Sequence, residues 1–342
     1  MRAGRSFFVH LGLLVVSAIV AVLMWTREQR PKALALADVN VWAGRPADIE
    51  RVLYEGKKKT VTLEAKKDDI GRWFVVTIDK EASAPTRKAD AGAGEDAGAG
   101  SAEPAARTQV TLVSVGAGEK LLELLAPLRA FRAVGKIETD RLAEFGLSEP
   151  EGTLTVRMGG SERKLTLGSG TPGGAERYVR YEGNGEVYVI KGDIVRDLDG
   201  AESKLIERDL HEWKDPEMSS AKITASGKTR EIVRGGSEGK RFWADPASPD
   251  QNDETVSNWI SKLEKLKPNE YVRQVPEGKE TVARVDYFGK SSKALGFLEL
   301  LKAPSETEGK PTYFILSERT RQLAKVSATA EQIEQDLGSI VK

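Results

Sequence analysis

A long apolar run near the start of the chain constrains its architecture most. Residues 7–25, from Phe7 to Trp25, contain one ionisable side chain, that of His10. As a helix rising about 1.5 Å per residue, the run would reach roughly 28 Å, which matches the hydrocarbon core of a bilayer. Phe7 and Trp25 stand at the two ends, where aromatic rings prefer the membrane interface. The run therefore predicts a single transmembrane helix.

Two other structures could contain the same run. A buried core helix is rarely apolar on every side over such a length. A cleaved signal peptide is the stronger alternative, because small-x-small patterns typical of a cleavage site begin at Ala33 and Ala35. However, Pro31 and three basic residues separate these sites from the run. The run is also longer than most signal cores.

The orientation of the predicted span rests on its flanks. Two basic residues precede the span and three follow it, so the excess of positive charge barely decides the orientation. A tail as short as residues 1–6 is typical of a signal anchor, which leaves the tail in the cytoplasm. We therefore expect a single-pass protein of the bacterial inner membrane with its body in the periplasm.

The composition excludes several classes of function. Lys and Arg total 52, and Asp and Glu also total 52, so no net charge draws the chain to nucleic acid. The chain has no cysteine, which excludes disulfides, thiolate metal sites and a lipid anchor on cysteine. Its two histidines are His10 and His211, too few for a histidine metal site within one chain. We expect no metal and no other cofactor.

The remainder of the chain has the pattern of two copies of one plan. After a polar stalk at residues 26–46, residues 47–200 contain alternating strands, an apolar helix and further strands, and residues 201–342 repeat this order. Residues 81–107 interrupt the first copy with an Ala- and Gly-rich sequence that lacks aromatic residues, Ile, Leu and Val. Such a composition predicts a disordered insertion.

These patterns predict an α+β fold class. In it, an N-terminal transmembrane helix precedes two related units of mostly antiparallel β-sheet, each covered by a helix. The covering helices are predicted at residues 119–131, which contain five leucines, and at residues 254–266, where apolar residues recur at helical spacing. Trp73 and Trp243 occupy equivalent strands of the two copies.

Several local motifs favour a family resemblance. Phe145-Gly146-Leu147 is followed by Pro150, then by Leu165-Thr166-Leu167-Gly168 and by a strand pair containing Tyr178 and Tyr188. With the apolar N-terminal run and the Trp73 strand, this pattern resembles a bacterial family of uncharacterised membrane-anchored proteins, domain of unknown function 4340. The second copy lacks a clear Gly-Leu-x-x-Pro step. The resemblance implies an association with gliding-motility-type ABC transport systems.

The sequence segments that could form a catalytic or binding site have simpler structural interpretations. The glycine-rich residues 168–174 and 235–239 lack the Gly-Lys-Ser/Thr ending of a phosphate loop and are more typical of hairpin turns. Asp193, Asp197 and Asp199 lack the spacing of a calcium loop, and Asp193 is predicted to cap a helix. His211 is predicted to lie in a linker between the copies. We name no catalytic, cofactor-binding or metal-binding residue.

The tryptophans offer one further hypothesis. An aromatic platform for glycan would need exposed rings, whereas core packing would bury them, and core packing is favoured. The residues concerned are Trp42, Trp73, Trp213, Trp243 and Trp259.

The sequence therefore favours a non-enzymatic, membrane-anchored extracytoplasmic scaffold or accessory protein of an ABC-type envelope transport complex. Its expected partners are the membrane, through the span from Phe7 to Trp25, and subunits of an ABC transporter. A periplasmic glycan- or peptidoglycan-binding module is the alternative. No nucleic-acid partner is expected, and the oligomeric state is not determined by the sequence.

Overall fold

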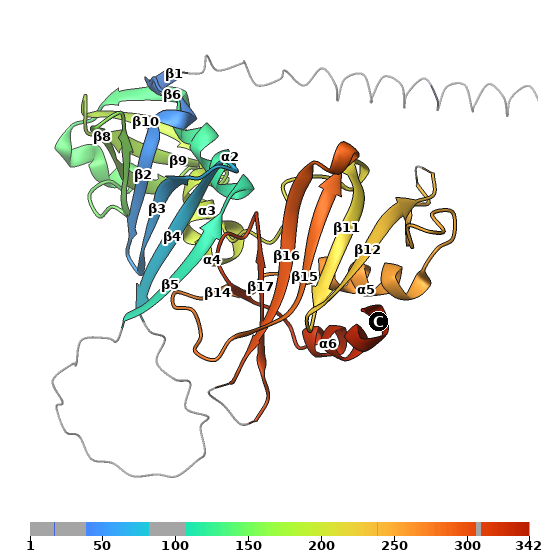
Figure 1. Ribbon diagram of the computed structural model, residues 1–342. Coiled ribbons are helices and arrows are strands. Elements are labelled where there is room, and N and C mark those ends of the chain that lie inside the picture. Colours follow the sequence, from blue (N-terminus) through green and yellow to red (C-terminus); the bar gives the residue numbers. More distant parts are fainter. Residues whose placement is uncertain (1–16, 18–38, 82–106, 238, 306–308, 342) are drawn as a thin grey trace, which may run out of the picture.

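Two antiparallel β-sheets, each accompanied by helices, make up the computed structural model (Figure 1). It describes residues 39–81, 107–237, 239–305 and 309–341, together with Ser17. The first sheet and its helices precede residue 205, and the second sheet and its helices follow residue 214. We call these the first and second units.

The first sheet has ten strands in the order β1-β6-β10-β9-β8-β7-β2-β3-β4-β5, and every neighbouring pair is antiparallel. One face is strongly apolar because buried and less buried residues alternate along its strands. The strands are β1 (Val39–Trp42), β2 (Ile49–Gly56), β3 (Lys59–Lys67), β4 (Arg72–Glu81), β5 (Arg107–Ser114), β6 (Leu128–Lys136), β7 (Gly152–Met158), β8 (Ser161–Gly170), β9 (Glu176–Tyr181) and β10 (Glu186–Lys191).

The second sheet has eight strands in the order β13-β12-β11-β15-β16-β17-β18-β14, again with antiparallel neighbours. The strands are β11 (Met218–Ala225), β12 (Lys228–Gly235), β13 (Phe242–Ala244), β14 (Glu270–Tyr271), β15 (Glu280–Gly289), β16 (Ala294–Ala303), β17 (Thr312–Ser317) and β18 (Ala324–Lys325).

Short helices complete both units. The α-helices are α2 (Gly116–Leu125), α3 (Asp193–Asp199), α4 (Ala201–Lys204), α5 (Glu254–Glu264) and α6 (Thr329–Ile340), and the 3-10 helices are η1 (Pro46–Asp48), η2 (Thr139–Phe145), η3 (Asp215–Glu217) and η4 (Lys290–Ser292). Asp253 caps the start of α5, because its carboxylate accepts a hydrogen bond from the Val256 backbone N–H. Helix α5 buries an apolar stripe and packs against α6, and the Trp259 ring nitrogen donates to the Ile333 carbonyl at 2.9 Å.

The two sheets have the same strand order once β1 and β5 are set aside. The two orders correspond strand by strand. The first sheet has β6-β10-β9-β8-β7-β2-β3-β4, and the second sheet, read in the same direction, has β14-β18-β17-β16-β15-β11-β12-β13. Local details agree as well. A 3-10 helix containing Pro46 or Pro216 precedes β2 and β11. The register of each strand then shifts once, directly after Ile49 and after Met218. The common plan seen in the sequence thus has a counterpart in strand topology.

The predicted fold class is wrong. The structure is mainly antiparallel β-sheet, and its helices are short. The helix predicted at residues 119–131 ends at Leu125, because the residue before Pro127 is disfavoured in a helical conformation. The chain then forms β6 instead. Strand β5 was not predicted, and residues 39–42, assigned from sequence to the stalk, form β1.

The transmembrane helix that was part of the predicted fold class is corrected as well. Except for Ser17, residues 7–25 lie outside the described residues, as do residues 26–38 and most of the predicted insertion, residues 82–106. In the portion of the chain that the structure describes, no helix is long and apolar enough to cross a membrane.

Candidate functional site

A linker of ten residues, 205–214, joins the two units and is largely held between them. Leu205, Ile206 and Leu210 are buried, and one cluster of apolar side chains continues through them from the first sheet to the second. The Glu207 backbone N–H donates to the Val113 carbonyl of β5 at 2.8 Å. The Tyr271 hydroxyl of β14 donates to the Glu207 carbonyl at 2.9 Å. The linker is therefore bound to both sheets.

A chain of ion pairs follows the linker across the junction. The Glu207 carboxylate lies 3.1 Å from the Arg319 guanidinium, which also contacts Glu212 at 2.6 Å. Glu212 contacts Arg321 at 3.3 Å, and Arg321 reaches Asp68 of the first unit at 2.7 Å. The side chains of Glu207 and Arg321 are only 6% and 5% exposed. We call these five residues the junction network.

The turn after β17 positions both arginines of the network. The Ser317 backbone N–H donates to the Thr320 hydroxyl at 2.9 Å, and Thr320 is fully buried. Arg321 has a φ of 55°, a left-handed conformation that is uncommon for a residue other than glycine. Such local strain persists only where surrounding contacts fix it. The contacts with Asp68 and Glu212 supply that constraint.

Electrostatics favour the charged forms of Asp68 and Arg319. The Arg321 guanidinium beside Asp68 is the main cause that lowers the pKa of that carboxyl. Burial acts to lower the pKa of Arg319, but Glu207 and Glu212 outweigh burial and raise it. Because a desolvated ion pair gains little net free energy over an apolar contact, its clearest effect is to select one geometry. The junction network is therefore suited to fixing the two units in one orientation.

A second polar cluster lies behind the same turn. The His211 ring nitrogen Nδ1 lies 2.9 Å from the buried Glu318 carboxylate, which also accepts the Phe297 backbone N–H at 2.9 Å. Gly296 permits this approach, because a Cβ there would lie 2.3 Å from the carboxylate. The His211 ring stacks on Trp213 at 4.3 Å between ring centroids. The cluster attaches the linker to the second sheet.

Glu264 adds a titratable group to the interior of the second unit. Burial raises its pKa, although His211, Tyr287 and Arg234 act in the opposite direction. The fully buried Tyr287 hydroxyl is an electrostatic neighbour of Glu264, but within the described residues neither that hydroxyl nor Glu264 Oε1 has a hydrogen-bond partner. The raised pKa indicates that the folded chain holds the Glu264 proton more tightly than the unfolded chain does.

Glu264→Gln tests this interpretation through the pH dependence of stability. A carboxyl with a raised folded pKa contributes stability below its unfolded pKa, near 4.3, and loses that contribution as pH rises toward the folded value. Glutamine cannot ionise, so the wild-type chain is expected to lose stability relative to the variant across that window. Urea denaturation of both proteins at a series of pH values measures the difference. Parallel curves would contradict the raised pKa.

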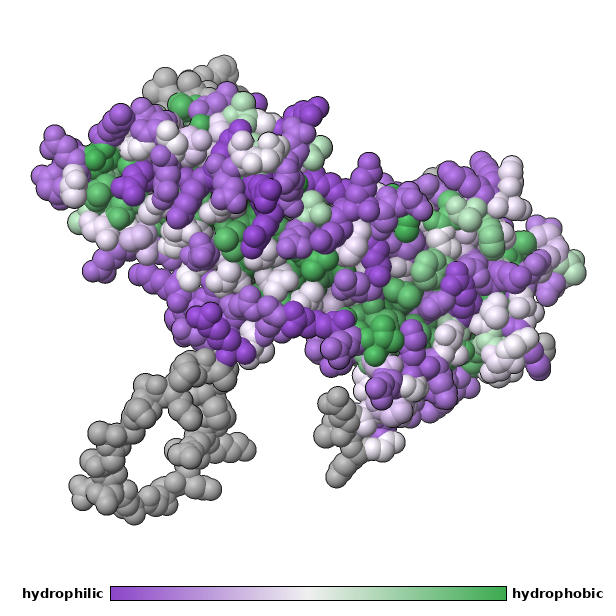
Figure 2. All heavy atoms as spheres, turned by 60° about the vertical axis from the view of Figure 1, so that its left-hand side comes forward, coloured by the Kyte–Doolittle hydropathy of each residue, from purple (hydrophilic) through white to green (hydrophobic). Residues whose placement is uncertain are grey.

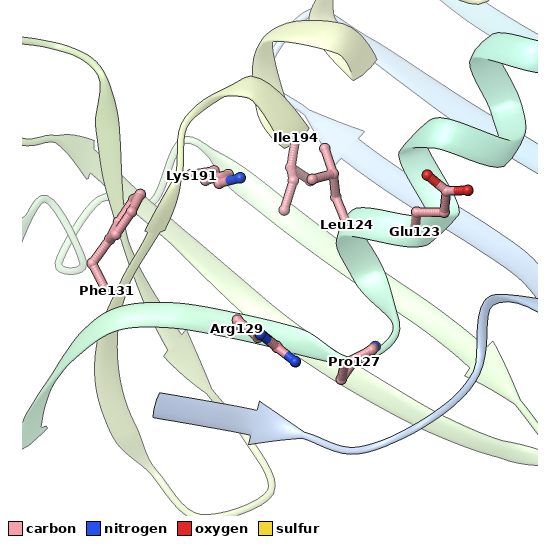
Figure 3. Close-up of a pocket in the computed structure, with 7 residues that line it drawn as sticks. All are labelled: Glu123, Leu124, Pro127, Arg129, Phe131, Lys191 and Ile194. Carbon is pink, nitrogen blue, oxygen red and sulfur yellow. The ribbon is translucent and has the colours of Figure 1, made fainter. Parts of the chain in front are cut away.

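A groove on the first unit is the other candidate contact site (Figure 3). It lies between the end of α2, strand β6 and the start of α3, and has a volume of about 360 Å³. Leu124 and Ile194 lie together on one side in Figure 3, and Lys191 extends between them and Phe131. Its lining residues are Glu123, Leu124, Pro127, Arg129, Phe131, Lys191 and Ile194. We call it the α2–α3 groove. Its mixed apolar and charged lining suits a protein contact more than an enclosed small molecule.

Figure 2 shows one face of the molecule, which is mainly hydrophilic, with its widest apolar area beside the boundary between the two units. Ile70 and Val275 are the large apolar residues that are more than half exposed within the described part of the chain. Scattered apolar residues of this kind are ordinary on soluble surfaces.

The glycine-rich and acidic motifs singled out in the sequence contribute no residue to the junction network or to the lining of the α2–α3 groove. Residues 168–174 form the end of β8 and a turn before β9, with positive φ at Gly173 and Gly174, as predicted for a hairpin. In the second unit, Gly235 ends β12, and Gly236 and Gly239 have positive φ in the connection to β13. Asp193 is not the helix cap that was predicted. It is the first residue of α3 and pairs with Arg196.

The tryptophan and histidine predictions agree with the structure. Trp42, Trp243 and Trp259 are buried, and Trp73 and Trp213 are partly buried against the core. His211 lies in the linker between the units, as predicted. In the described ranges no group of histidine and carboxylate side chains could hold a metal ion.

Comparisons with known proteins give one match. Residues 117–286 match a family described as Domain of unknown function (DUF4340). The matched segment begins in α2 and ends in β15, so it includes the linker and part of each sheet. No curated protein and no solved structure matches the chain. The match supports the resemblance to a domain of unknown function and carries no statement about a membrane anchor or transport.

Proposed function

We propose that this chain is a non-catalytic accessory or scaffold protein of an ABC-type envelope transport complex, on the periplasmic side of the bacterial inner membrane. The observation that carries the proposal is the junction network, which links the two β-rich units through the buried Glu207 of the linker, the buried Arg321 of the second unit and the partly exposed Asp68 of the first. A scaffold needs such a fixed geometry between its contact surfaces, because each flexible joint would add an ordering cost to binding. The family resemblance supports the transport context.

The sequence features support the location. The motifs that carry the family resemblance favour the membrane, and the neutral net charge gives no reason to expect nucleic acid as a partner. The alternative glycan-binding role has less support, because Trp42, Trp243 and Trp259 are buried and cannot stack on a sugar ring.

Recovery of the full-length chain from its native host in mild detergent tests the proposal. The chain should be found in the membrane fraction, and the membrane and ATP-hydrolysing subunits of an ABC transporter should be enriched at least tenfold over an unrelated protein with the same tag. A chain found only in the cytosol, or one recovered without transporter subunits, would contradict the proposed function. Binding of the purified chain to isolated cell wall would favour the glycan-binding alternative.

The α2–α3 groove supplies a matched pair of variants for the same experiment. Lys191 lines the groove, whereas Lys164 of β8 is exposed and lies outside it. If the groove contacts a transporter subunit, Lys191→Glu should weaken recovery of that subunit by about tenfold, because a reversed charge at an interface disfavours association. Lys164→Glu should leave recovery unchanged. Equal recovery with both variants would exclude the groove as the contact.

A further inference from the structure

Strand β12 is paired with a neighbouring strand along only part of its outer edge. It pairs with β11 along residues 228–233, but it pairs with β13 only through Val233, Arg234 and Gly235. Among the described residues, segment 228–232 therefore has a strand on one side only. Figure 1 shows β12 as the last long strand at that margin of the second sheet.

The first unit shows what occupies the same place in the common plan. Strand β3 is the counterpart of β12 and begins at Lys59, as β12 begins at Lys228. Every residue of β3 from Lys59 to Lys67 pairs with β4, and β4 pairs in turn with β5. In the described part of the chain, the second sheet has the short β13 in place of β4 and no counterpart of β5. The missing part corresponds to the second half of β4 together with β5.

We propose that residues 228–232 of β12 bind an extended segment of a partner protein, which adds to the second sheet as an antiparallel strand. An edge strand presents a row of backbone N–H and C=O groups, and an added strand satisfies them. The inference rests on the duplicated topology and does not depend on the transport context. It assigns the second unit a contact surface distinct from the α2–α3 groove.

The side chains of the edge restrict the partner's chemistry. Lys228 and Arg230 are basic and Glu231 is acidic, and Thr229 and Glu231 are exposed. Arg230 is held toward the helices, where it donates to Asp253 at 2.6 Å and to the Ile340 carbonyl at 3.0 Å. Because Asp253 neutralises Arg230, Lys228 and Glu231 leave one charge of each sign at the edge, and an approaching strand that carries both signs would complement them. We therefore expect a segment like residues 76–80 of β4, in which β-branched apolar residues alternate and charged residues of both signs are present.

The edge also bears on whether a second copy of this chain could be the occupant. Charged residues on an exposed edge, here Lys228 and Glu231, are a common means by which proteins prevent a strand from pairing with a copy of itself. The edge therefore suits a partner of different sequence.

Strand β4 itself provides a defined probe. A capped peptide with its residues 74–81, FVVTIDKE, has the alternation that fits beside β3, where Val76 and Ile78 are fully buried, and it also carries Asp79. The full chain is incubated with this peptide, and hydrogen exchange of backbone amides is followed by mass spectrometry. Exchange in residues 228–232 should slow at least tenfold at saturating peptide.

The control is the same peptide N-methylated at alternate residues, made in both alternations. One alternation removes the N–H groups that face β12, so it should give no protection, while the other should protect as the parent does. Unchanged exchange at residues 228–232 with millimolar parent peptide would overturn the proposal. Equal protection by both methylated peptides would overturn it as well. Protection that grows with protein concentration when no peptide is present would also overturn it, because that result would identify a second copy as the occupant.

Discussion

Replacing Arg319 with methionine is expected to lower the free energy of unfolding by about 3–5 kcal/mol. The Arg319 guanidinium is 14% exposed and contacts both Glu207 and Glu212. Methionine fills much of the same volume but leaves the buried Glu207 carboxylate without its cation, and an uncompensated buried charge is costly. Urea denaturation followed by circular dichroism measures the loss.

Two comparisons make this prediction specific to the junction. Arg196 forms an ion pair with Asp193 within α3 and is 62% exposed, so Arg196→Met should cost no more than about 1 kcal/mol. Combining Arg319→Met with Glu207→Gln should restore part of the loss, because the stranded charge is then removed. A loss for Arg319→Met no larger than that for Arg196→Met would show that the junction pair contributes little.

Trp259→Ala is expected to produce the other large loss, about 3–5 kcal/mol. Trp259 is 1% exposed in α5, and its ring nitrogen donates to the Ile333 carbonyl of α6. Alanine would leave a cavity between the two helices and the second sheet, and the Ile333 carbonyl would lose its partner. Thermal or urea denaturation of the full chain gives the change in stability.

The control for this variant is Ile70→Ala. Ile70 is an apolar residue that is 51% exposed, so its truncation should change stability by no more than about 0.5 kcal/mol. Trp259→Phe should fall between the two, because it keeps most of the apolar volume and loses one hydrogen bond worth about 1 kcal/mol. Similar stabilities for the alanine and phenylalanine variants would indicate that the core around α5 repacks freely.

Local periodicity was sufficient for most of the sheet. Apolar and polar residues alternate along strands such as β7 and β15, which is the pattern that predicts the sheets, and α5 was predicted because its apolar residues recur at helical spacing. Strand β6 was missed because the helix predicted from the leucines before Pro127 was continued past that proline to residue 131. Strand β5 was missed because it begins directly after the Ala- and Gly-rich segment and pairs with β4 across it.

The junction network could not be predicted in the same way. Arg319 and Arg321 occur in a short charged turn, a pattern that usually indicates a solvated hairpin tip. Their partners lie far away in sequence, Glu207 in the linker and Asp68 in the turn after β3. Nothing local distinguishes these arginines from others that face solvent, since burial arises only when the second unit packs on the first. The positive φ of Arg321 likewise has no local signal.

The ladder between β4 and β5 continues to its last pair, Glu81 with Arg107. The two ends of the intervening sequence are therefore held side by side by the sheet itself. The entropy of closing a loop grows only slowly with its length, by about 0.6 kcal/mol for each doubling. Changes in the length or sequence between Glu81 and Arg107 should therefore change the free energy of folding little. A reporter domain inserted there should leave the first sheet intact.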